Sequence, residues 1–270
     1  MSDKLYGFFA RDTQTRSLLM TGFFLAGLLA VTAMAALVDD RTLNGVSVWS
    51  KPLKFDLSIM LHSFTLVILA QQLTVKARTG WLMVFSTGAY ALAVVTENVY
   101  ITVQGMRGRA SHFNFETQIE SLLYAMMGIG SLLLVGMAMV IAVLVWRQKD
   151  TPWTGYRLGI VIGCLVGPVL TIAYGGYMSM TSSHFVGAPL QSDAGGLPLL
   201  GWSTEVADLR PAHFFALHII QISPFVGWLM DKIIPGLSKI AVIGVSLAMA
   251  ALSSWLFFNA LAGNALPFFG

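Results

Sequence analysis

Charged residues are scarce in this chain, and their scarcity excludes a soluble protein. Asp, Glu, Lys and Arg make up 11% of the 270 residues, whereas a soluble domain carries roughly 25%. Hydrophobic residues account for 56% of the chain, so we expect an integral membrane protein in contact with the lipid bilayer. The net charge of +3 predicts no nucleic-acid partner, because the basic residues are divided among short loops and form no patch.

Cysteine is almost absent, and familiar catalytic motifs are absent altogether. The single cysteine, Cys164, excludes an internal disulfide. Its position in an apolar stretch predicts a small buried side chain. The sequence contains no P-loop, HExxH, GxSxG or Rossmann glycine motif. The function must therefore be inferred from the polar residues that lie within or beside the apolar stretches.

Long apolar stretches dominate what is present. A helix needs about 20 apolar residues to cross the hydrocarbon core of a bilayer. Seven stretches of this kind occur, at about 17–38, 55–75, 81–104, 119–146, 157–178, 211–230 and 240–260. We therefore predict an all-α polytopic bundle of about seven transmembrane helices. Since few residues remain outside these stretches, we expect residues 1–270 to form a single transmembrane domain.

The distribution of basic residues predicts how the bundle is oriented. With the N-terminus in the cytoplasm, ten of the 16 Lys and Arg residues fall in cytoplasmic segments and six in outer ones. This bias agrees with the positive-inside rule. We therefore predict a cytoplasmic N-terminus and an outer C-terminus, and we expect a bacterial cytoplasmic (inner) membrane.

The histidines all fall at the outer face or in the outer half of this predicted bundle. They are His62, His112, His184, His213 and His218. His62 shares a helix face with Lys54 and lies about 12 Å below it, at 1.5 Å per residue. His213 and His218 open the sixth predicted helix. Their five-residue spacing puts them about 140° apart around the helix, so we expect distinct environments for them.

Acidic residues gather on the same predicted side. Glu97 is the only carboxylate within the third predicted helix, and Glu120 opens the fourth. Ionisable groups within a membrane are costly, so they indicate a functional site. For Glu97 an ion pair with Arg107 or Arg109 is an equally good structural explanation. By residue counting, His62, Glu97, Glu120 and His218 lie at similar depth.

One functional hypothesis is a haem, copper or iron centre for redox chemistry or electron transfer in the outer half. The cofactor would be bound by His62, His213 and His218, and a metal ion by His62, His218 and Glu97. Glu97 and Glu120 would be the catalytic, proton-relaying residues. An anionic or quinone-like substrate would be steered by Lys54, Arg107 and Arg210.

Two alternatives use the same residues differently. The first is a zinc-dependent lipid hydrolase, in which a metal-activated water attacks an ester or amide. Asp56, Ser58 and His62 are similar to one element of the membrane zinc hydrolases that act on lipid amides. That family also needs a closely spaced histidine pair on its last helix, and the last predicted helix here has no histidine. The second alternative is a non-enzymatic small-solute transporter, sensor or membrane assembly partner.

A weak internal repeat slightly favours the transporter class. Lys51 to Phe55 (KPLKF) and Arg210 to Phe214 (RPAHF) lie 159 residues apart, and each segment opens a predicted helix. Parallel repeats of helices occur in membrane transporters. A proline in the first turn is also a common helix opening, which gives the pattern a purely local explanation.

Three glycines predict close helix packing. Gly159, Gly163 and Gly167 are spaced by four residues, so they form a flat strip on the fifth predicted helix. This strip and the outer loops are candidate docking faces for another membrane protein. The third outer loop, at about 179–210, is the longest, and we interpret it as a lid or a docking surface.

Overall fold

A computed structural model describes residues 12–187, 196–197 and 200–266. Residues 188–195 and 198–199 of the predicted 179–210 loop lie outside these described residues. The structure is almost entirely helical, and its internal contacts group into two compact units, Met1–Leu144 and Val145–Gly270. The expectation of a single domain is not tested by this division and stays a prediction.

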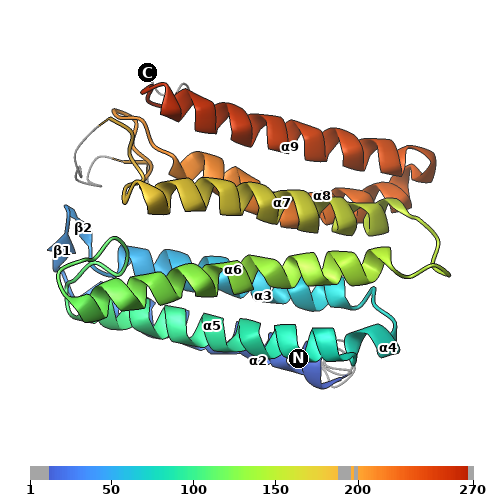
Figure 1. Ribbon diagram of the computed structural model, residues 1–270, viewed down its shortest axis with the longest axis horizontal. Helices are drawn as coiled ribbons and strands as arrows, with labels where there is room; N and C mark the ends of the chain where they lie inside the picture. Colours follow the sequence, from blue (N-terminus) through green and yellow to red (C-terminus); the bar gives the residue numbers. More distant parts are fainter. Residues whose placement is uncertain (1–11, 188–195, 198–199, 267–270) are drawn as a thin grey trace. The chain divides into compact units, whose positions relative to one another are not determined.

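The first unit contains four long helices and a small hairpin (Figure 1). Its elements are α2 (Thr13–Val38), β1 (Thr42–Leu43), β2 (Val46–Ser47), α3 (Ser50–Ala70), α4 (Val75–Arg78), α5 (Trp81–Met106) and α6 (Gln118–Trp146). The two strands pair antiparallel around Asn44 and Gly45, which both have positive φ angles, as a tight hairpin turn requires. The side chain of Asp12 caps α2 by accepting a 3.0 Å hydrogen bond from the Thr15 amide.

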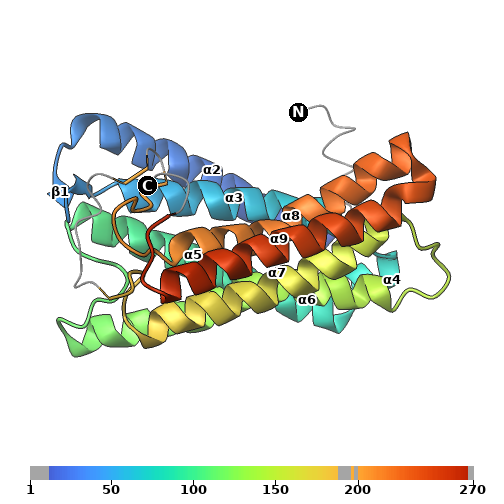
Figure 2. The same ribbon diagram turned by 90° about the horizontal axis from the view of Figure 1, so that it is seen from above.

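The second unit is a three-helix bundle. Its elements are α7 (Gly155–Met180), α8 (Arg210–Ile233), the 3-10 turn η1 (Pro235–Leu237) and α9 (Ser238–Leu261). These three long helices run side by side in both views (Figures 1 and 2). Asp231 of α8 caps the start of α7, accepting hydrogen bonds from the Gly155 amide at 2.8 Å and the Tyr156 amide at 2.7 Å.

The predicted membrane bundle is confirmed. Within the described ranges, seven helical segments of 21 to 29 residues are long and apolar enough to cross a bilayer. The largest boundary error concerns α3, which spans Ser50–Ala70 rather than the predicted 55–75. The helix starts early because Pro52 fits the first turn, where no backbone amide hydrogen is needed. His62 consequently lies twelve residues inside α3, close to the middle of the helix.

The two units share an order of elements. Adding the 159-residue offset to the first residues of α3, α4 and α5 gives positions 209, 234 and 240. The corresponding elements α8, η1 and α9 begin at Arg210, Pro235 and Ser238. The offset therefore matches the starts of three consecutive elements to within two residues.

The glycine strip of α7 packs against α8 of the same chain. A Cβ atom added at Gly159 would lie 2.4 Å from the Ser223 carbonyl oxygen, and one added at Gly163 would lie 2.7 Å from the Ile219 carbonyl oxygen. The predicted close packing is confirmed. The use of the strip as a docking face for another protein is wrong, because α8 already covers it.

We expect Gly163→Ala to destabilise the second unit by about 1–3 kcal/mol, since the new methyl group meets a backbone atom that cannot move alone. Thermal unfolding in detergent would measure the loss. Gly176→Ala on the same helix is the control, because its added Cβ has no atom within 4 Å. Equal unfolding temperatures for the two variants would contradict this account of the α7–α8 interface.

Candidate functional site

His62 occupies the interior of the first unit, between α3 and α6. Its buried Nε2 lies 3.3 Å from the Leu134 carbonyl oxygen of α6. Because a carbonyl only accepts hydrogen bonds, Nε2 carries the hydrogen. The other ring nitrogen, Nδ1, has no hydrogen-bond partner among the described residues. The ring centroid lies 6.0 Å from that of Tyr90 on α5, so α3, α5 and α6 all border this imidazole.

Glu97 of α5 points at the same helix, α6. The carboxyl group fits against Gly130, where an added Cβ would lie 2.3 Å from Oε1. This Oε1 is buried and has no hydrogen-bond partner within the part of the chain that the structure describes. Glu97 is the only charged residue of α5. A glycine at position 130 therefore makes room for an acidic side chain in the middle of the unit.

The structure brings His62 and Glu97 to one face of α6. Their contact positions, Leu134 and Gly130, are four residues apart, which is one helical turn or about 6 Å along the axis. Nearby, the Ser63 and Tyr90 hydroxyl groups are 2.7 Å apart and join α3 to α5. A polar interior thus runs between three helices that are otherwise apolar.

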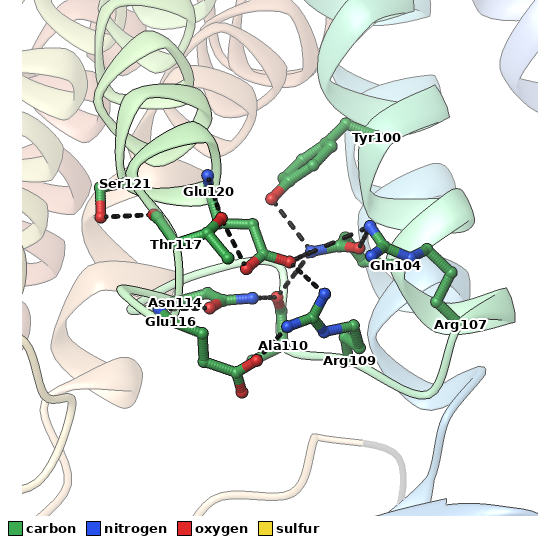
Figure 3. Close-up of polar contacts among 10 residues, drawn as sticks. All are labelled: Tyr100, Gln104, Arg107, Arg109, Ala110, Asn114, Glu116, Thr117, Glu120 and Ser121. Atoms are coloured by element: carbon green, nitrogen blue, oxygen red, sulfur yellow. Dashed lines mark hydrogen bonds and ion pairs between the residues drawn. The ribbon is translucent and has the colours of Figure 1, made fainter.

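Glu120 belongs to a different cluster, at the outer end of α5 and α6 in the predicted orientation (Figure 3). Its Oε1 lies 2.9 Å from Nη1 of Arg109 and 3.9 Å from Nη1 of Arg107. Gln104 donates a 3.4 Å hydrogen bond to the same oxygen. The two arginines thus contact Glu120, and no ion pair between them and Glu97 is present among the described residues.

Arg109 also contacts the exposed Glu116, and this hydrogen bond raises the pKa of the Arg109 guanidinium above its ordinary value. Glu120 lies two residues from the start of α6, whereas His62 lies twelve from the start of α3. These positions differ by ten residues, or about 15 Å of helix rise. The expectation of similar depth is wrong for Glu120, because helix ends and not apolar stretches set the depth.

His213 and His218 lie on α8 of the second unit, in distinct environments. The His213 ring packs beside Gly175 of α7, where an added Cβ would lie 3.2 Å from Cε1. The His218 Nδ1 lies 2.8 Å from the Phe214 carbonyl oxygen one turn earlier. His62 and Glu97 belong to the first unit. A shared cofactor between these residues and the α8 histidines therefore stays a prediction.

The basic residues expected to steer a substrate have structural contacts of their own. Arg210 holds the buried Asp208, with Nη2 at 2.8 Å from Oδ2, and donates a 2.7 Å hydrogen bond to the Gly201 carbonyl oxygen. Arg107 is half exposed and donates a 2.9 Å hydrogen bond to Oε1 of Gln104. Lys54 lies in the second turn of α3 and is partly buried. Their role in steering stays a prediction.

Sequence reasoning left Asp56 out of the candidate site. This residue of α3 is only 1% exposed, and its Oδ2 lies 3.0 Å from the Thr32 hydroxyl oxygen of α2. Its Oδ1 has no hydrogen-bond partner in the described part of the structure. An acid within a predicted span was the available signal. The sequence had pointed to Asp56 only through the similarity to the zinc hydrolases, and the residue lies off the helix face that carries Lys54 and His62.

We expect Glu120→Gln to destabilise the first unit by about 1–3 kcal/mol, since it removes a buried charged acceptor from Arg109 and Gln104. Glu116→Gln is the matched control, because Glu116 contacts the same arginine but its side chain is 66% exposed. Exposed ion pairs contribute little, so this variant should unfold close to the wild type. Thermal unfolding in detergent compares them, and the reverse order of stability would refute the assignment.

Across the described ranges, no group of three or more His, Cys, Asp or Glu side chains lies close enough together to hold a metal ion. The proposed metal ligands His62, Glu97 and His218 are divided between the two units, so their grouping stays a prediction. No protein-family model, curated protein or solved structure matches this chain.

Proposed function

We propose that this integral membrane protein moves protons at a site formed by His62 and Glu97, as part of a transporter for a small solute. One observation carries the proposal. Two ionisable side chains from different helices reach successive turns of α6 in the interior of the first unit, and each has a polar atom without a partner. Buried ionisable groups within membrane spans mark ion or proton pathways.

The hydrogen bonds support complementary proton roles for the two side chains. An ionised Glu97 would place an unpaired charge in the bundle interior, which is costly, so we propose that its carboxyl group carries a proton. His62 keeps its Nε2 hydrogen on the Leu134 carbonyl oxygen and has a lone pair at Nδ1. Glu97 is then the proton donor and His62 the acceptor. We propose that water bridges their unpartnered atoms, Oε1 of Glu97 and Nδ1 of His62.

Proton movement at this site would change the packing of α6. Loss of the Glu97 proton places a charge against Gly130, and gain of a proton at His62 places one beside Leu134. A change in charge at two points of one helix face biases α6 between arrangements against α3 and α5, which is the kind of change that alternating access requires. The element order shared by the two units also favours the transporter class.

A metal or haem centre is the second candidate, because the His62 Nδ1 lone pair is also a suitable metal ligand. In a haem bound by two axial histidines, His213 or His218 could supply the other ligand. Measurement of iron, copper and zinc in the purified protein tests this candidate. Near-stoichiometric iron or copper that is lost in His62→Ala would support the redox hypothesis, and zinc would support the lipid hydrolase.

Proton uptake by proteoliposomes tests the main proposal. Vesicles containing the full chain and a trapped pH-sensitive dye are given an inward-directed driving force with potassium and valinomycin, with and without a panel of small organic acids, amino acids and sugars. We expect uptake above that of protein-free vesicles. Glu97→Gln and His62→Phe should each reduce proton uptake to the protein-free level, because the new glutamine or phenylalanine side chain cannot bind and release a proton.

The control for this assay is Glu116→Gln, which removes an exposed carboxylate outside the membrane spans and should leave uptake unchanged. All variants are first matched for unfolding temperature and for orientation in the vesicles. The proposal fails if Glu97→Gln and His62→Phe transport protons as fast as the wild type. It also fails if the wild type never exceeds protein-free vesicles with any solute of the panel.

A further inference from the structure

The buried carboxyl groups of the described residues divide into two pairs. Glu120 and Asp208 each contact an arginine, whereas Asp56 and Glu97 have no ion-pair partner within the described ranges. All four side chains are less than a tenth exposed. Glu97 belongs to the proposed proton site on α6. Asp56 lies in a separate interface, between α2 and α3, and that site has no role in the function proposed above.

The Thr32 hydroxyl group lies within hydrogen-bond distance of both the Leu29 carbonyl oxygen and Asp56, and the role of Asp56 depends on which of them it donates to. The Thr32 hydroxyl oxygen lies 3.1 Å from the Leu29 carbonyl oxygen and 3.0 Å from Oδ2 of Asp56. A hydroxyl group has one hydrogen to donate, and the carbonyl can only accept it. If Thr32 donates to Asp56, the carboxyl group only accepts; if Thr32 donates to Leu29, a protonated carboxyl group supplies the hydrogen of the Asp56 contact. The burial of Asp56 without an ion-pair partner favours the second arrangement, because an unpaired buried charge is costly.

Helix α2 offers Asp56 no basic side chain as an ion-pair partner within the bundle. This helix has no Asp, Glu, Lys, Arg or His between Arg16 and its end at Val38. Besides Asp56, the charged or titratable groups of the other helices in this unit are Lys51, Lys54 and His62 on α3, Lys76 and Arg78 on α4, Tyr90, Glu97 and Tyr100 on α5, and Glu120 and Tyr124 on α6. The one-turn neighbours of Asp56 on α3, Pro52 and Met60, are uncharged.

We infer that Asp56 and Thr32 form a second proton-binding site, in which a protonated carboxyl group joins α3 to α2. The ligand is the proton itself. Its release would require the Thr32 hydroxyl to turn from Leu29 to Asp56, and water to reach the unpartnered Oδ1. Deprotonation is thereby tied to hydration of the α2–α3 interface. The inference does not depend on transport at His62 and Glu97.

Modification by dicyclohexylcarbodiimide tests the inference, because this apolar reagent forms a stable adduct with protonated carboxyl groups in apolar surroundings. The full chain is labelled in detergent, digested and analysed by mass spectrometry. We expect adducts on Asp56 and Glu97 and none on the arginine-paired Glu120 and Asp208. Asp56→Asn should lose the first adduct and keep the one on Glu97, which serves as the internal control.

Infrared spectroscopy of the same samples tests the inference even when dicyclohexylcarbodiimide cannot reach Asp56. A protonated Asp56 contributes a carboxylic-acid stretching band that is present in the wild type and missing in a folded Asp56→Asn variant. Absence of this band overturns the inference. Protection of Asp56 from labelling by sodium chloride but not by potassium chloride would also overturn it, in favour of a sodium site.

The two proposals fail separately. An adduct on Glu97 without an adduct or an infrared band for Asp56 would remove the second site and leave the proposed function intact. An adduct and a band for Asp56, combined with normal proton uptake in Glu97→Gln, would remove the proposed function and keep the second site.

Discussion

A polar group within the hydrocarbon core has no water to bond to, and the arrangement of this chain depends on that constraint. Backbone groups are satisfied within long helices. Several acidic side chains follow the same rule: the buried Glu120 contacts Arg109, the buried Asp208 contacts Arg210, and the half-buried Asp231 accepts from two amide groups at the start of α7. Some buried polar atoms of the described residues break the rule, and atoms of the ionisable residues His62, Glu97, Asp56 and His213 are among them.

The two units satisfy the constraint with different chemistry. In the second unit, glycine and serine bring the helices together: Gly163 packs on the α8 backbone, and the Ser223 and Ser246 hydroxyl oxygens are 2.8 Å apart across α8 and α9. In the first unit, buried ionisable groups lie between the helices. Small residues suit close packing, whereas ionisable ones suit a change of state. The first unit brings two such groups, His62 and Glu97, to one face of α6, and that is where we locate proton chemistry.

Much of the architecture was predictable from hydropathy, because bilayer thickness sets the length of each span. The number of spans and the strip at Gly159, Gly163 and Gly167 followed from composition and spacing. Membership of a site was less predictable. Glu97 and Glu120 look alike in the sequence, yet one meets Gly130 and the other meets Arg109. Which partner faces a side chain depends on helix rotation, and a single amphipathic pattern is too weak to define it in an apolar helix.

The sequence by itself determined that the chain is a helical membrane bundle and that ionisable groups lie inside it, since both depend on local composition and on the cost of burying polar groups. Tertiary structure decided which of those groups are neutralised. It brought the Leu134 carbonyl oxygen within hydrogen-bond distance of His62, and the Thr32 hydroxyl group within hydrogen-bond distance of Asp56. It also brought both arginines of the 107–117 loop into contact with Glu120. These choices depend on contacts between helices distant in sequence, and such contacts exist only after the helices have packed.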